Sequence, residues 1–206
     1  MIDRLLVLVA LLIGAATVYI LGVYGVERGF DLTDESFYLI WAEQPQEVMP
    51  GVSSYGFYTQ LLYRLAGEKI MPFRLLGMVV LAAVATAFAI NLTAALNAAV
   101  KPTGELGGAL KCLLTITLVV SSSGYYFWLW LNTPSYNWMN LIGVLLVGIG
   151  LIRWLAISAS WTVLCALLIA AGGFICYAAK PPTAGILAVL AVVVAWRATR
   201  PALPLI

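Results

Sequence analysis

Long stretches of uncharged, apolar sequence constrain this chain more than any other feature. They occupy residues 5–26, 75–100, 112–152, 154–179 and 181–196. A helix needs about 20 apolar residues to cross the hydrocarbon core of a bilayer. The third run has 41 residues and is too long for one helix, so we expect its polar segments at 121–124 and 132–137 to divide it. The pattern predicts an all-α integral membrane protein with about six transmembrane helices, of which the third and fourth cover about 109–129 and 136–157.

The composition excludes several other classes of protein. Hydrophobic residues make up 63% of the chain and charged residues only 10%, whereas soluble domains carry roughly 25% charged residues. A disordered chain and a disulfide-stabilised secreted domain are excluded for the same reason. The net charge of +2 does not favour nucleic acid as a partner, and the absence of histidine removes histidine-based metal sites.

The distribution of basic residues predicts the orientation in the membrane. Six spans place both termini on one side, and most of the basic residues near span ends then share that side: Arg4, Lys101, Lys111, Arg153, Arg197 and Arg200. The short connection at 124–136 on the opposite side has no charge, and the one at 178–182 has only Lys180. The positive-inside rule therefore predicts that both termini are cytoplasmic and that residues 27–70 are external.

The external segment 27–70 has the character of a functional loop. Seven of the nine acidic residues lie in it: Glu27, Asp31, Asp34, Glu35, Glu43, Glu47 and Glu68. Two amphipathic stretches follow one another, the first carrying Phe37, Ile40 and Trp41 on one face. In the second, Tyr58, Leu61, Leu62 and Leu65 form an apolar stripe opposite Gln60, Arg64 and Glu68. Such helices should lie in the membrane interface and cover the outer ends of the spans.

The acidic residues at the start of the first amphipathic stretch allow two interpretations. Asp31 would be an N-cap with Asp34 near the third helical position, and Asp34 and Glu35 would then complement the helix dipole. Alternatively, a carboxylate near the membrane surface would act as a general base, especially if partial burial raises its pKa. Lys180 has a similar alternative, because a lysine at a helix end often extends its ammonium group to the interface.

The order of these features resembles the N-terminal half of the GT-C membrane glycosyltransferases, the group that includes protein O-mannosyltransferases and lipid A aminoarabinose transferases. Asp34-Glu35-Ser-Phe-Tyr38 resembles the Asp-Glu-x-x-Tyr motif of the first external loop of that family. An interfacial helix ending in Gly67 and followed by Arg74 resembles the next feature, and Ala179-Lys180-Pro181 resembles the lysine at the external end of the fifth helix. The likeness runs over nearly the whole chain.

The resemblance implies an enzyme that transfers a sugar from a polyprenyl-phosphate donor to an external glycan, lipid or protein, with inversion at the anomeric carbon. It implies that 1–206 is a single transmembrane domain whose external loop, residues 27–70, is of the catalytic type, in a bacterial inner membrane. Asp34 would be the general base, and Glu35 would orient the acceptor or hold a divalent cation; no other cofactor is implied. The residues that would contact substrate are Arg28, Asp31, Tyr38, Arg74, Asn137 and Lys180.

The chain also departs from the family pattern. Asn137 stands near the start of the fourth span, where many members have an acidic residue. Some members carry a basic residue just before the interfacial helix, and residues 51–55 contain none. Full members are about twice as long, so we expect this chain to be part of a longer protein or a reduced relative. Two alternatives follow: a non-catalytic membrane scaffold or pseudoenzyme, and half of a transporter or lipid flippase. A carrier would need ionisable residues at mid-membrane, and no Asp, Glu, Lys or Arg lies in the middle of a predicted span.

Overall fold

The computed structural model describes residues 2–27, 34–48, 53–99, 108–130, 132–156 and 162–199. Eight helices make up most of this part of the chain: α1 (Ile2–Val26), α2 (Glu35–Glu43), α3 (Tyr55–Leu65), α4 (Ile70–Ala99), α5 (Gly108–Trp130), α6 (Tyr136–Ala156), α7 (Thr162–Ala179) and α8 (Pro181–Thr199). No strand occurs among the described residues. The prediction of an all-α fold is confirmed, and each of the six predicted spans corresponds to one long helix.

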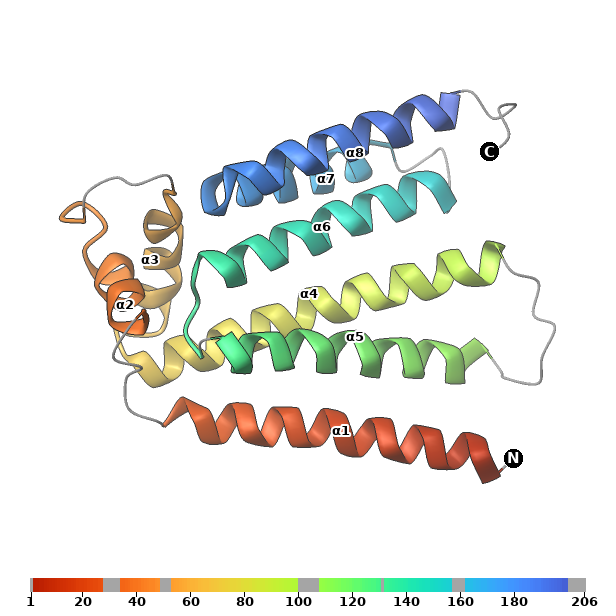
Figure 1. The fold of residues 1–206 in the computed structure, drawn as a ribbon, viewed down its shortest axis with the longest axis horizontal. Helices are drawn as coiled ribbons and strands as arrows, with labels where there is room; N and C mark the ends of the chain where they lie inside the picture. The colour runs from red at the N-terminus through yellow and green to blue at the C-terminus, as the bar shows by residue number, and fades with distance from the viewer. Residues whose placement is uncertain are drawn as a thin grey trace.

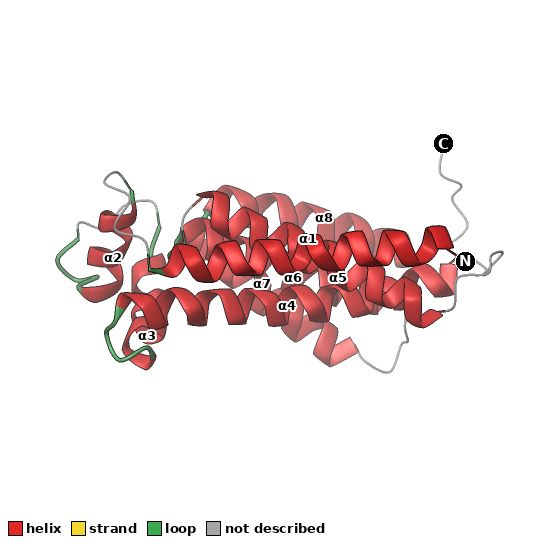
Figure 2. Cartoon of the chain, turned by 90° about the horizontal axis from the view of Figure 1, so that it is seen from below, coloured by secondary structure: helices red, strands yellow, loops and turns green. Residues whose placement is uncertain are grey.

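The six long helices lie side by side, and the two short ones sit together at one end of the bundle (Figure 1). A second view from below places α2 and α3 at the same end (Figure 2). The start of α1 and the end of α8 lie at the opposite end (Figure 1). The segments that meet beside α2 and α3 are therefore the end of α1, the start of α4, the connection from α5 to α6 and the junction of α7 with α8.

Proline and glycine determine several helix ends at the end of the bundle where α2 and α3 lie. Pro181 opens α8, as expected for proline in the first turn of a helix. Pro134 lies in the non-helical connection before α6, and proline disfavours helical backbone in the residue that precedes it. Gly67 and Glu68 have φ angles of 68° and 57°, so a left-handed turn ends α3 and reverses the chain into α4.

Close approach of α6 and α7 depends on two facing glycines. A Cβ atom at Gly143 would lie 2.7 Å from the backbone oxygen of Gly172, and one at Gly172 would lie 2.5 Å from the backbone oxygen of Gly143. Such close packing through small residues is typical of helices that associate in membranes. It brings the backbones of α6 and α7 close together at this point.

Within the described residues, two helices are long and apolar enough to cross a membrane: 29 residues of α4, Ile70–Ala98, and 20 residues of α6, Tyr136–Leu155. Shorter apolar stretches occur within α1 (Leu11–Val26), α7 (Val163–Ala179) and α8 (Pro181–Trp196). The structure therefore has helical membrane character, and the number of spans and their orientation stay predictions.

Three of the four residues of the predicted apolar stripe of α3 face away from the bundle. Tyr58, Leu61 and Leu65 are 43%, 66% and 71% exposed, whereas Leu62 is partly buried and packs against the core. The face of α3 that packs inward instead carries Tyr55, Thr59 and Tyr63, together with Gly56. An outward apolar face on a helix at the end of the bundle is the arrangement expected of a helix in the membrane interface.

Candidate active site

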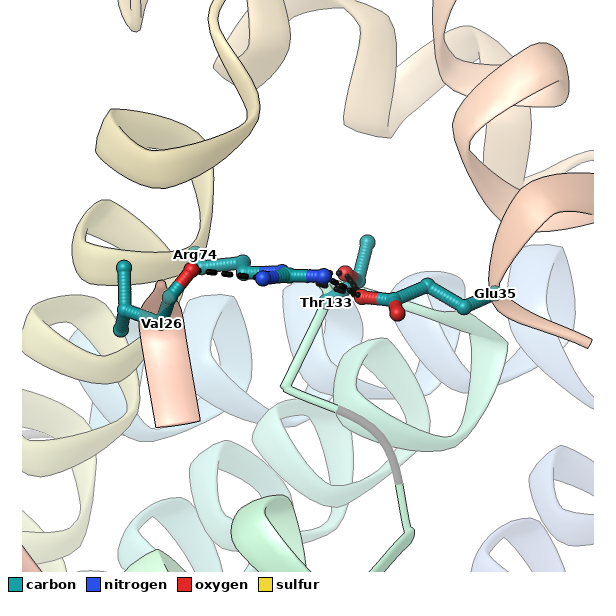
Figure 3. A network of polar contacts seen from close by, with 4 residues as sticks. All are labelled: Val26, Glu35, Arg74 and Thr133. Atoms are coloured by element: carbon teal, nitrogen blue, oxygen red, sulfur yellow. Dashed lines mark hydrogen bonds and ion pairs between the residues drawn. The ribbon is translucent and has the colours of Figure 1, made fainter. Parts of the chain in front are cut away.

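A buried ion pair between Glu35 and Arg74 lies where α2 meets the start of α4 (Figure 3). The Nη2 and Nε atoms of Arg74 donate hydrogen bonds to Oε1 of Glu35 over 2.6 and 3.0 Å. The hydroxyl of Thr133 donates to the same oxygen. Nη1 of Arg74 donates to the backbone oxygen of Val26 over 2.6 Å. Because the two charged side chains are only 3% and 4% exposed, water does not screen their attraction.

This polar network joins four segments that are distant in sequence. Val26 ends α1, Glu35 begins α2, Arg74 belongs to the first turns of α4, and Thr133 lies between α5 and α6. Breaking a buried pair by removing one partner is strongly destabilising, because an uncompensated charge is left behind. The network therefore fixes the first residue of α2, and with it the position of Asp34.

Asp34 stands at the N-cap position of α2, and its side chain makes no capping hydrogen bond. The capping interpretation placed Asp34 near the third helical position, but α2 begins one residue later, at Glu35. Only Glu35 lies in the first turn, where a negative charge complements the helix dipole. The carboxylate of Asp34 is exposed and makes no capping hydrogen bond, while its N-cap position still lets its charge complement the dipole of α2.

An open cavity of about 790 Å³ lies beside Asp34. Its lining comes from α2, α3, the start of α6 and the junction of α7 with α8: Asp34, Phe37, Tyr38, Trp41, Val48, Ser53, Tyr55, Tyr136, Ala179, Lys180, Pro181 and Pro182. The carboxylate of Asp34 and the ammonium group of Lys180 therefore line the same open cavity, together with several aromatic rings. Its volume is in the range of small-molecule sites.

Lys180 occupies the residue between α7 and α8. Its backbone N–H donates to the carbonyl of Cys176 over 2.6 Å, which holds it at the end of the last turn of α7. Its Nζ lies 4.9 Å from the centre of the Tyr136 ring, a cation–π contact. This contact holds the ammonium group at the cavity, since the C-terminus of α7 favours a cation there but the N-terminus of α8, whose first N–H groups donate to the Lys180 carbonyl, does not.

Aromatic rings form the inner wall of the cavity. Tyr38, Tyr55 and Tyr136 contact one another, with ring centroids 5.6 to 5.9 Å apart. Trp41 packs edge-on against Tyr55 at 4.6 Å. Burial raises the pKa of Tyr38, and its hydrogen bond and electrostatic interaction with Tyr136 raise that pKa further. Burial likewise raises the pKa of Tyr55. Both phenols stay protonated at neutral pH, so they can donate hydrogen bonds but cannot act as bases.

The aromatic wall is attached to α7 through the residues before α3. The hydroxyl of Ser53 and the backbone N–H of Ser54 both donate to the carbonyl of Ala178, each over 2.9 Å. These bonds satisfy one of the last carbonyls of α7, which has no partner within its own helix. They also hold Tyr55, the first residue of α3, close to Lys180.

Trp41 reaches Tyr55 by lying directly over Gly56. A Cβ atom at position 56 would overlap Cδ1, Cγ and Nε1 of the Trp41 ring. We therefore expect Gly56→Ala to destabilise the fold by about 1–3 kcal/mol, since the buried indole has to move. The measurement is the midpoint of thermal unfolding of the purified protein in detergent.

Gly173→Ala is the matched control for that substitution. Gly173 is also helical, and a Cβ atom there meets nothing within 4 Å. Replacing glycine by alanine in an open helix is expected to be neutral or to stabilise by up to about 1 kcal/mol. Equal midpoints for Gly56→Ala and Gly173→Ala would show that Trp41 is not held against Gly56.

The structure separates the predicted site residues into two groups. Asp34, Tyr38 and Lys180 line the cavity. Glu35 and Arg74 instead bind one another in the neighbouring buried network and are not among the lining residues. The remaining predicted site residues are Arg28, Asp31 and Asn137. The first two lie outside the described residues, and Asn137 is buried near the start of α6.

The cavity and the buried network also contain residues that were not among the predicted site residues, including Trp41, Tyr55, Thr133 and Tyr136. Trp41 was placed on an apolar helix face with Phe37 and Ile40, and only Trp41 of the three is buried. Tyr55 opens the interfacial-helix motif, and Thr133 and Tyr136 lie in the polar segment that divides the long apolar run. The positions of Tyr55, Thr133 and Tyr136 in those segments were the sequence feature that could have identified them as site residues.

No three Asp, Glu, Cys or His side chains in the described part of the chain lie close enough to hold a metal ion. Glu35 is already bound by Arg74 and Thr133. The predicted binding of a divalent cation at Glu35 is therefore not supported by this arrangement.

Comparison with known proteins found no family model, no curated protein and no solved structure that matches the chain. The resemblance to the GT-C glycosyltransferases therefore depends on the sequence motifs and on what their residues do in the fold.

Proposed function

We propose that this chain is a membrane glycosyltransferase of the GT-C type, or its N-terminal catalytic portion, which transfers a sugar from a polyprenyl phosphate to an external acceptor. The observation that carries the proposal is the shared cavity of Asp34 and Lys180. Two residues that are 146 positions apart, and that carry the opposite charges the reaction needs, line one aromatic hollow. An uncharged wall of tyrosine and tryptophan suits the apolar face of a sugar ring.

In the proposed reaction, Asp34 takes the proton of an acceptor hydroxyl. The acceptor oxygen forms a bond to the anomeric carbon, and the bond from that carbon to the phosphate oxygen breaks. The electron pair leaves with the lipid phosphate, whose added negative charge the ammonium group of Lys180 offsets. Attack opposite the leaving group inverts the anomeric carbon. The acceptor is an external glycan, lipid or protein.

The membrane arrangement that we propose has six spans, α1 and α4 to α8, with both termini in the cytoplasm of a bacterial cell. Two observations support it. The long helices run beside one another with α2 and α3 at one end (Figure 1), and α3 turns the exposed side chains of Leu61 and Leu65 outward. The cavity would then open at the external interface, where a lipid phosphate and a water-soluble acceptor can meet.

Lys180 provides the first test of this proposal. We expect Lys180→Ala to weaken binding of a polyprenyl phosphate by about tenfold or more, because a hydrogen bond to a charged group is worth about 1.5–3 kcal/mol. Lys180→Arg should retain part of the affinity, because the charge is kept. The measurement is equilibrium binding of a radiolabelled polyprenyl phosphate to the purified protein in nanodiscs.

Lys69→Ala is the control, because Lys69 is an exposed lysine at the same end of the bundle that does not line the cavity. Its loss should leave affinity nearly unchanged, and any small effect should disappear at high salt. If Lys180→Ala binds the lipid phosphate as tightly as the wild type, Lys180 is only an interfacial lysine and the proposed donor site is wrong.

A further inference from the structure

Two polar atoms in the aromatic wall are buried without a hydrogen-bond partner. They are the hydroxyl of Tyr55 and Nε1 of Trp41, and neither has a partner among the described residues. Tyr55 is completely buried and Trp41 is 6% exposed. Both residues line the cavity that also holds Asp34 and Lys180.

Such atoms are unfavourable for stability. A buried donor or acceptor that loses water without gaining a partner costs about 1–3 kcal/mol, and the polar groups of buried Tyr and Trp usually have partners. Phenylalanine at position 55 would fill the same space without that cost. Packing alone therefore does not explain a tyrosine at this position, whereas a ligand that enters the cavity would supply the missing partner.

The chemistry of the groups around the cavity defines that ligand. The indole N–H of Trp41 and the ammonium group of Lys180 can only donate hydrogen bonds. Burial raises the pKa of Tyr55, so its hydroxyl keeps a proton to donate as well. Asp34, at another part of the lining, accepts. A polyhydroxylated ring fits this set of groups, because a sugar can accept from the aromatic wall, stack on its rings and donate to Asp34.

We propose that Tyr55 and Trp41 bind the transferred sugar and set the preference for the sugar over the bare lipid phosphate. This inference rests on the proposed function and adds to it a site for the glycosyl group. Both atoms are covered in the present arrangement, with the Tyr38 and Tyr136 rings 5.8 and 5.9 Å from Tyr55 between centroids. Entry of the sugar must therefore shift part of the aromatic wall.

The test uses Tyr55→Phe, which removes one oxygen and keeps the ring. The probes are a bare polyprenyl phosphate and polyprenyl phosphates that carry mannose, glucose or 4-amino-4-deoxyarabinose. We expect the wild type to bind at least one glycosylated probe more tightly than the bare one. Tyr55→Phe should lose about threefold to tenfold of affinity for that probe and keep its affinity for the bare phosphate. Its melting temperature should stay equal to that of the wild type or rise.

Tyr58→Phe is the matched control, because Tyr58 lies one turn along α3 and contacts Phe174 outside the cavity. It should change neither affinity. Trp41→Phe should also lower the affinity for the glycosylated probe and not for the bare phosphate, although the smaller phenyl ring leaves an empty space where the indole was.

The outcomes are distinguishable. A Tyr55→Phe protein with a lower melting temperature and an unchanged preference for the glycosylated probe would show that the hydroxyl has a structural partner, and would overturn the inference. A wild type that binds all probes equally would overturn it too, while binding that depends on Lys180 would leave the proposed function standing. Absence of binding to every probe would overturn the proposed function itself.

Discussion

Replacing Asp34 by asparagine is expected to lower sugar transfer by roughly 10²–10⁴, the usual contribution of general acid–base catalysis. The substitution keeps the shape of the side chain and removes its ability to accept a proton. It should not disturb α2, because the Asp34 side chain makes no capping hydrogen bond and is exposed. We therefore expect yield and melting temperature to match those of the wild type.

The measurement is transfer from a lipid-linked sugar to a panel of external acceptors, on this chain or on a longer parent protein that contains it. Glu47→Gln is the control, since Glu47 is an exposed acid near α2 that does not line the cavity. Near-normal transfer by Asp34→Asn would remove the proposed base. A wild type that binds the donor without transferring the sugar would favour the scaffold alternative.

Helix ends were predicted well from the sequence where proline marks them, and less well where a charge was the guide. Pro181 was expected to open the last helix, and it does. By contrast, the second uncharged run begins at 75, after Arg74, whereas α4 begins at Ile70. Arginine is a good helix former, so Arg74 continues the helix, and its charge is buried there against Glu35. A rule that treats every arginine as water-facing cannot anticipate this.

The cavity could be predicted only in part, because its residues come from distant parts of the chain. Asp34, Tyr38 and Lys180 were named from motifs, and they do lie together. The pairing of Glu35 with Arg74 spans 39 positions, and nothing in the local sequence identifies the partner. Trp41 shows the same limit. Its helical spacing placed Trp41 on one face with Phe37 and Ile40. In the structure the ring of Trp41 packs inward, because Gly56 has no side chain and leaves room for it. Periodicity describes one helix at a time, whereas burial depends on what packs against it.

The ion pair of Glu35 and Arg74 leads to the largest expected effect on stability. Arg74→Met should lower the free energy of unfolding by about 3–5 kcal/mol, because Glu35 is then left buried without its charged partner. Arg64→Ala, an exposed arginine of α3, should change it by no more than about 0.5 kcal/mol. Reversible unfolding in mixed detergent micelles with increasing dodecyl sulfate gives these values.

The double variant Arg74→Met with Glu35→Leu tests whether the loss comes from the unpaired charge. Replacing a buried pair by apolar residues is often neutral or stabilising, so we expect the double variant to be more stable than Arg74→Met alone. A coupling energy of 0.5–3 kcal/mol is typical of residues in direct contact. Additive effects of the two substitutions would mean that the pair is not formed in solution.

Activity of the double variant then separates stability from positioning. The ion pair joins the first residue of α2 to α4, and Asp34 is the residue before it. Apolar replacements restore packing, but they do not reproduce the directed bonds from Arg74 and Thr133 to Glu35. We therefore expect a double variant that folds, binds the lipid phosphate through Lys180 with nearly unchanged affinity, and has a lower kcat because Asp34 is less precisely held. A double variant with full kcat would show that the network stabilises this end of the bundle without positioning the base.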